Sequence, residues 1–72
     1  MFTFFKGQVQ NILSTSIIVV NDFWGVEIYT PYTFSINATV ALYIYTNFSS
    51  ETGMTYFGFL TLEELEFFQL LI

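Results

Sequence analysis

Residues 55–72 read TYFGFLTLEELEFFQLLI, and they predict a β-strand that leads directly into a helix. Thr55–Phe59 is dominated by aromatic residues around one glycine, which is typical of a strand. Thr61 and Glu64 have the spacing of a capping box. In that motif the Thr hydroxyl accepts a hydrogen bond from the N–H of Glu64, and the Glu carboxylate accepts one from the N–H of Thr61. The sequence therefore predicts a helix that begins at this threonine.

The predicted helix is apolar on nearly all sides. One stripe at helical spacing consists of Leu62, Leu65, Phe68 and Ile72. Phe67, Leu70 and Leu71 lie outside this stripe, and a helix of this kind needs partners on more than one side. We therefore expect that the chain is a fragment of a longer protein or that it packs against copies of itself. The alternative is that the last turn of the helix frays.

Four further strands are expected upstream, from hydrophobic alternation between turn residues. They fall within residues 1–13, 17–20, 24–30 and 39–46. We expect a bend or bulge at Gly7, a hairpin turn at Asn21–Asp22 and a strand end at Pro31. The second strand is expected to be buried on both faces.

The alternation is clearest in residues 39–46. Val40, Leu42 and Ile44 point to one face, and the intervening residues point to the other. Residues 31–37 are expected to form a loop or one helical turn, and residues 47–53 an exposed hairpin tip. The predicted protein is mainly β, a five- to six-stranded OB-type Greek-key barrel over residues 1–60 followed by one C-terminal helix over residues 61–72.

The composition argues against catalysis. The 72-residue chain has neither His nor Cys, so it lacks an imidazole base, a thiolate nucleophile and a nitrogen or sulfur metal site. We expect no enzyme activity, no cofactor and no metal. The net charge is −5 with a single basic residue, Lys6, so the chain alone should bind nucleic acid poorly. No apolar run is long enough for a membrane helix and no signal peptide is recognisable, so we expect no membrane partner.

Aromatic side chains are the remaining candidates for ligand contact, because OB barrels can stack bases on them. The candidates are Trp24, Tyr29, Tyr32, Tyr43 and Tyr45. Packing in the core and at interfaces is the competing interpretation, and the acidic charge of the chain favours it.

Several of these features together resemble one protein family. They are Gly7, Gly25-Val26-Glu27-Ile28, Phe57-Gly58-Phe59, and Glu64 with Phe68 and Leu71-Ile72. The chain resembles the N-terminal domain of the RuvA family, the Holliday-junction binding subunits of the bacterial branch-migration complex. The resemblance spans essentially the whole chain.

The resemblance implies an OB-type barrel that assembles as a homotetramer and holds an open four-way DNA junction during recombination and repair in the bacterial cytoplasm. In the family, a second domain with helix-hairpin-helix motifs makes most of the duplex contacts, and residues 61–72 would be its first helix. A third domain binds the RuvB-type motor ATPase, and a RuvC-type resolvase is a further partner. These downstream domains would lie beyond Ile72.

The family also carries an acidic pin, usually Arg-Glu-Asp, at a hairpin tip near the junction centre. This run falls on Ser50-Glu51-Thr52, so the resemblance carries over Glu51 alone and implies weaker repulsion of the junction phosphates. Two other functions stay open. One is a structural oligomerisation module without DNA contact, and the other is a single-strand-binding OB domain that uses the tyrosines.

Overall fold

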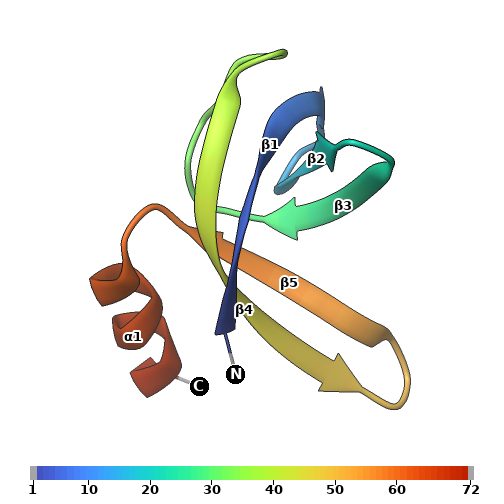
Figure 1. Ribbon diagram of the computed structural model, residues 1–72. Helices are drawn as coiled ribbons and strands as arrows, with labels where there is room; N and C mark the ends of the chain where they lie inside the picture. Colours follow the sequence, from blue (N-terminus) through green and yellow to red (C-terminus); the bar gives the residue numbers. More distant parts are fainter. Residues whose placement is uncertain (1, 72) are drawn as a thin grey trace.

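The computed structural model describes residues 2–71. Five strands precede a single helix in this part of the chain (Figure 1). They are β1 (Phe2–Ile12), β2 (Ser16–Asn21), β3 (Trp24–Tyr29), β4 (Thr39–Ser49), β5 (Gly53–Phe59) and α1 (Leu62–Leu71). The prediction of a mainly β protein with one C-terminal helix is confirmed.

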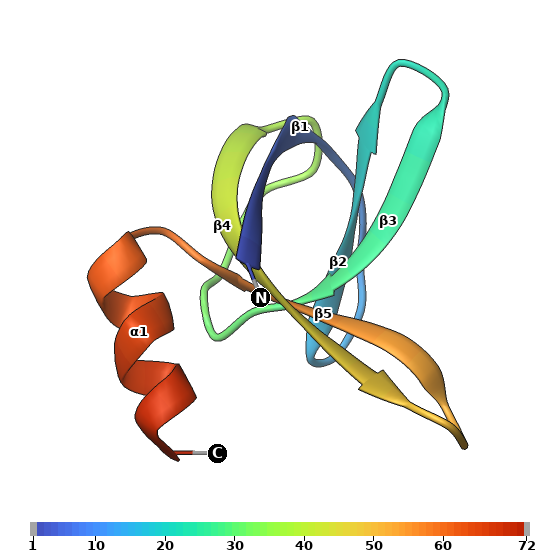
Figure 2. The same cartoon turned by 60° about the horizontal axis from the view of Figure 1, so that its bottom comes forward.

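The strands form a closed barrel in the order β1-β2-β3-β5-β4. All neighbouring pairs are antiparallel except β3 and β5, which are parallel and meet at the single pair Tyr29 and Phe57. Beyond that pair, the two strands diverge toward their hairpin ends (Figure 2). The architecture is OB-like, as predicted, with five strands in the described residues.

Strand β1 serves two sides of the barrel. Residues 2–8 pair with β4, and residues 8–12 pair with β2. Gly7 lies where the pairing partner of β1 changes from β4 to β2, and a Cβ atom there would lie 2.3 Å from the carbonyl oxygen of Val20. The glycine is therefore required by the close approach of two backbones.

Of the bend or bulge expected at Gly7, the bulge is wrong, because the register shifts between Val9 and Asn11 instead. Near this shift, β1 also bonds to the connection between β3 and β4. The N–H of Val9 donates to the carbonyl of Ala38 over 2.9 Å, and the N–H of Asn37 donates to the carbonyl of Val9 over 2.7 Å. Val9 thus satisfies its backbone N–H and C=O groups on the connecting loop.

The core fills the barrel with aliphatic side chains. It consists of Val9, Ile17, Val19, Ile28, Val40, Leu42 and Ile44. The predicted alternation in β4 is confirmed. Strand β2 is fully buried on one face only, since Ile18 and Val20 are half-buried. The described connection at residues 31–38 contains no helical turn, and its Phe34 packs against the core.

Both hairpin turns differ from the predicted boundaries. Asn21 pairs with Trp24, so the β2–β3 turn consists of Asp22 and Phe23, and Asp22 adopts a φ of 54°. The β4–β5 pairing continues to Ser49 and Gly53, which shortens the tip to residues 50–52. Polar residues suggested a longer loop, but cross-strand pairing extends the ladder through them.

Helix α1 packs on β4 and β5 through one stripe, as predicted. Leu65 is completely buried, and the ring of Phe68 lies 5.0–5.8 Å from the rings of Tyr45, Phe57 and Phe59. The other predicted stripe member, Ile72, lies outside the described residues. Within residues 2–71, no helix combines the length and hydrophobicity that crossing a membrane would require.

Candidate interaction site

The β4–β5 hairpin forms an arm that projects away from the barrel (Figure 1). Its tip is exposed at residues 50–52 and carries the Glu51 carboxylate. The backbone N–H of Glu51 donates to the Oγ atom of Ser49 over 3.2 Å, which orders the turn. Phe48 and Met54 are cross-strand partners on this arm and both are exposed. The structure thus places the predicted pin residue at the end of a projecting hairpin.

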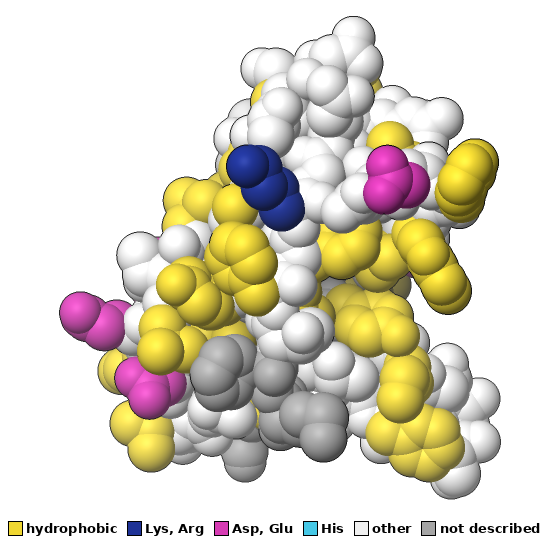
Figure 3. Space-filling view, in the orientation of Figure 1, with side chains coloured by type: hydrophobic (Ala, Val, Ile, Leu, Met, Phe, Trp, Pro, Cys, Tyr) yellow, Lys and Arg dark blue, Asp and Glu magenta, His cyan; other side chains and the backbone are white. Residues whose placement is uncertain are grey.

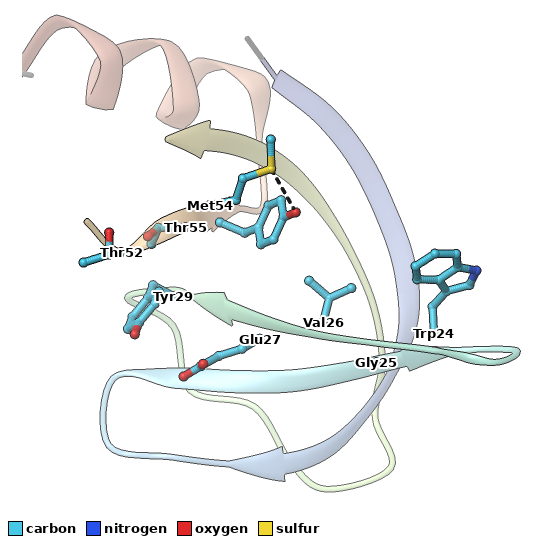
Figure 4. Close-up of a pocket in the computed structure, with 9 residues that line it drawn as sticks. Trp24, Gly25, Val26, Glu27, Tyr29, Thr52, Met54 and Thr55 are labelled. Carbon is cyan, nitrogen blue, oxygen red and sulfur yellow. Dashed lines mark hydrogen bonds between the residues drawn. The ribbon is translucent and has the colours of Figure 1, made fainter. Parts of the chain in front are cut away.

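A groove of about 440 Å³ lies where β3 and β5 diverge. Val26 of β3 and Met54 of β5 lie on opposite sides of it, with Trp24 near the β2–β3 turn (Figure 4). The Tyr56 hydroxyl donates to the sulfur of Met54 over 3.5 Å. The exposed fraction of Trp24 is 73%, so its indole is available to a partner.

Glu27 is the charged residue among those that line this groove. The hydroxyl of the buried Ser16 donates to its Oε2 atom over 2.7 Å. Because Ser16 belongs to the neighbouring strand β2, this bond holds the Glu27 side chain against the sheet. The carboxylate is therefore oriented while remaining accessible at the edge of the groove.

The predicted base-stacking tyrosines are engaged within the chain. Each of the four packs against one phenylalanine, with ring centroids 5.2–6.0 Å apart. The pairs are Tyr29 with Phe57, Tyr32 with Phe34, Tyr43 with Phe4, and Tyr45 with Phe68. These contacts favour the packing interpretation for the tyrosines. Trp24 makes no aromatic contact of this kind among the described residues.

The capping box at the start of α1 forms in part. The N–H of Glu64 donates to the Thr61 hydroxyl over 3.2 Å, as predicted. The Glu64 carboxylate, however, accepts from that same hydroxyl over 3.1 Å, where a bond from the Thr61 N–H was expected. The hydroxyl can accept one hydrogen bond and donate another, so it couples the cap to the carboxylate.

We expect Thr61→Ala to lower the free energy of unfolding by about 1 kcal/mol, because the variant loses the side-chain acceptor for an unpaired helix N–H. Thr61→Ser keeps the hydroxyl, so its free energy of unfolding should fall much less. Urea denaturation followed by circular dichroism measures both variants. Equal losses for the two would show that the methyl group, not the cap, carries the effect.

Tyr32 ties the β3–β4 connection to the start of α1. Its hydroxyl accepts a hydrogen bond from the N–H of Leu60 over 3.2 Å. Burial raises the pKa of the Tyr32 hydroxyl, the Leu60 N–H opposes this rise, and the nearby Glu64 carboxylate adds to it. The phenol therefore stays protonated, and this contact fixes the chain where β5 ends and α1 begins.

Hydrophobic side chains are exposed in two groups on the face seen in Figure 3, one over α1 and one along the edge between the two hairpin tips. On α1, Phe67, Leu70 and Leu71 are exposed, as their positions outside the packed stripe predict. Exposed apolar area of this kind commonly marks an interaction surface. The described residues contain no group of three or more acidic side chains arranged to hold a metal ion.

Sequence reasoning missed the groove between β3 and β5. Its residues carry only the signals of strands, because Val26, Met54 and Tyr56 are ordinary strand residues in local context. The pattern Gly25-Val26-Glu27-Ile28 is part of the family resemblance, but it does not predict the hydrogen bond between Glu27 and Ser16.

Fold and site together define a small OB-like barrel with a projecting acidic-tipped hairpin and a C-terminal helix. No family model matches this chain, and no curated protein matches it.

Proposed function

We propose that this chain is the N-terminal domain of a RuvA-like subunit that assembles as a homotetramer and shapes a four-way DNA junction. The observation that carries the proposal is the β4–β5 arm, which projects from an OB-like barrel and ends in the exposed carboxylate of Glu51. The capped helix that directly follows Phe57-Gly58-Phe59 is a second point of agreement with the family pattern.

The mechanism is geometric, and the domain performs no catalysis. A net charge of −5 disfavours phosphate binding, so downstream helix-hairpin-helix domains would supply the duplex contacts. Four copies of the arm would bring four Glu51 carboxylates to the crossover. There they would repel phosphates and hold the strands apart for a RuvB-type motor in the bacterial cytoplasm. A RuvC-type resolvase would act on the same complex.

Exposed apolar residues of α1 support the assembly part of the proposal. Phe67, Leu70 and Leu71 present a face that the barrel does not cover. In the RuvA-like arrangement, the following domain or a neighbouring subunit covers this face. Burial there would stabilise the assembly through the hydrophobic effect.

We expect Glu51→Gln, in the complete protein that carries this domain, to change the rate of branch migration about fourfold while junction affinity changes less than twofold. Two unit charges 5 Å apart in water interact by about 0.8 kcal/mol, which corresponds to that factor. Synthetic four-way junctions with the motor present measure the rate, and gel shifts measure the affinity.

Glu63→Gln is the matched control, since it removes one exposed carboxylate from the first turn of α1 and leaves the arm intact. Its migration rate should equal that of the wild type. An unchanged rate for Glu51→Gln would refute the pin role.

The second candidate is a structural oligomerisation module without DNA contact, which the exposed face of α1 also favours. It predicts an oligomer of defined mass in light scattering but no junction binding by the complete protein. Binding of the complete protein to a junction that persists in the presence of excess duplex DNA would exclude this second candidate.

A further inference from the structure

The groove between β3 and β5 is bounded by two strand edges. Strand β3 is paired along its length with β2, and β5 with β4, but in the described residues they meet each other only at Tyr29 and Phe57. The facing edges of both strands are therefore open on the hairpin side of that pair. An open edge presents unpaired N–H and C=O groups to any further strand.

The β2–β3 turn determines which backbone groups face the groove. Asn21 and Trp24 flank a two-residue turn, so they form a hydrogen-bonded pair. Hydrogen-bonded and non-hydrogen-bonded pairs alternate along an antiparallel ladder. Val26 therefore bonds to β2, whereas Gly25 and Glu27 direct their N–H and C=O groups toward the groove.

The side chains around this edge call for an alternating partner. Val26 faces inward, packs against the core and lies beside Met54 and Tyr56 in the groove lining. Glu27 faces outward, where it accepts the hydrogen bond from Ser16. Residues directly opposite each other in paired strands share a face. An added strand would thus place an apolar side chain opposite Val26 and the next side chain opposite Glu27.

The acidic charge around the groove favours a cationic side chain at the position opposite Glu27. Glu27 lines the groove, Asp22 lies two residues from the lining residue Trp24, and Glu51 precedes the lining residue Thr52. No Lys or Arg lines the groove. A second copy of this chain would bring its own Glu27 and Glu51 carboxylates without a balancing cation, because the single lysine lies in β1. Nucleic acid would be repelled for the same reason.

We infer that the groove receives an extended segment of a partner protein, which adds as a strand to the open edge of β3 and alternates apolar with cationic residues. Backbone hydrogen bonds to Gly25 and Glu27 provide the affinity, and the apolar and acidic surroundings select the sequence. This inference goes beyond the proposed junction role, because the backbone hydrogen bonds that define the site are made by β3, although Thr52 at the tip of the arm also lines the groove.

The acetylated and amidated hexapeptide Lys-Val-Lys-Val-Lys-Val is the probe, titrated into the ¹⁵N-labelled 72-residue chain. At saturation we expect hydrogen exchange at the amides of Gly25 and Glu27 to slow at least about tenfold. The amide of Val26, already bonded to β2, should change less than about twofold. The same peptide N-methylated at every residue keeps every charge, cannot donate to β3 in either strand orientation, and should bind at least about tenfold more weakly.

Two substitutions at Gly25 separate backbone pairing from side-chain effects. Gly25→Pro removes an outward N–H without removing a bond to β2, and edge strands accept proline at such positions. Gly25→Ala adds a Cβ at an ordinary 3.5 Å from Val20 and keeps the N–H. We expect the proline variant to lose about tenfold in peptide affinity and the alanine variant less than twofold. Glu27→Gln should lower the affinity for the peptide about two- to fivefold, and this loss should be smaller at high salt.

Three results would overturn the inference. The first is an absence of binding by the hexapeptide, and the second is equal binding of its N-methylated form. The third is a dimer in light scattering that Gly25→Pro abolishes, which would make a second copy the occupant of the groove. Because none of these measurements uses DNA, their failure would leave the junction proposal intact, and failure at the junction would leave this site intact.

Discussion

Gly7→Ala should be among the most damaging single substitutions in this chain, with an expected loss of about 3 kcal/mol in the free energy of unfolding. The added Cβ would lie 2.3 Å from the carbonyl oxygen of Val20 and 2.9 Å from the Cγ1 atom of Val19. The first of these atoms belongs to the backbone, so no rotamer change can relieve the clash. Strands β1 and β2 would have to separate where β1 passes from one side of the barrel to the other.

For a domain of this size, each kcal/mol corresponds to about 4–8 °C in melting temperature, so the variant should melt far below the wild type. Thermal and urea unfolding at one fixed protein concentration measure the loss, since self-association would otherwise alter the apparent stability. Gly25→Ala is the matched control. Its Cβ meets only an ordinary contact at 3.5 Å, so its stability should stay within about 0.5 kcal/mol of the wild type. Similar melting of the two alanine variants would refute the close approach at Gly7.

Leu65→Ala should also cost about 3 kcal/mol, within the range for deleting a fully buried leucine. Leu65 is completely buried and anchors α1 against the barrel. Loss of the leucine side chain would leave a cavity beneath the helix and would weaken the packing of Phe68 against Phe57 and Phe59. Near-ultraviolet circular dichroism should report the loosened aromatic packing before global unfolding.

Leu70→Ala provides the comparison on the same helix. The exposed fraction of Leu70 is 83%, and alanine has a high helix propensity, so the expected change in stability is within about 0.5 kcal/mol. Light scattering should reveal any loss of self-association for this variant. If both variants were equally destabilised in the monomer, the assignment of buried and exposed faces of α1 would be wrong.

Much of the fold was predictable because its signals are local. Alternation in residues 39–46 predicted the buried face of β4, since successive side chains of a strand point to opposite faces. Thr61 and Glu64 predicted the start of α1 because a cap acts within one helical turn. The exposed positions of Phe67 and Leu70 followed from helical spacing alone.

The candidate site was predictable only in part. The exposed position of Glu51 followed from the polar residues around it, but the length of the arm did not, because pairing between β4 and β5 extends through polar residues. The sequence predicts a bend or bulge at Gly7, whereas the register shifts between Val9 and Asn11, close to the hydrogen bonds of Val9 with Asn37 and Ala38. Those bonds join segments that are far apart in sequence, so no local pattern reports them.

Glycine shows this division most clearly. Strands around Gly7 and Gly58 are predictable because alternation and β-propensity act between near neighbours. The reason that these two positions are glycine lies in contacts between distant strands. A Cβ at Gly58 would lie 2.6 Å from the Cγ2 atom of Ile28, and one at Gly7 would meet the backbone of β2. The groove has the same origin, since β3 and β5 diverge as a result of how a twisted sheet closes into a barrel.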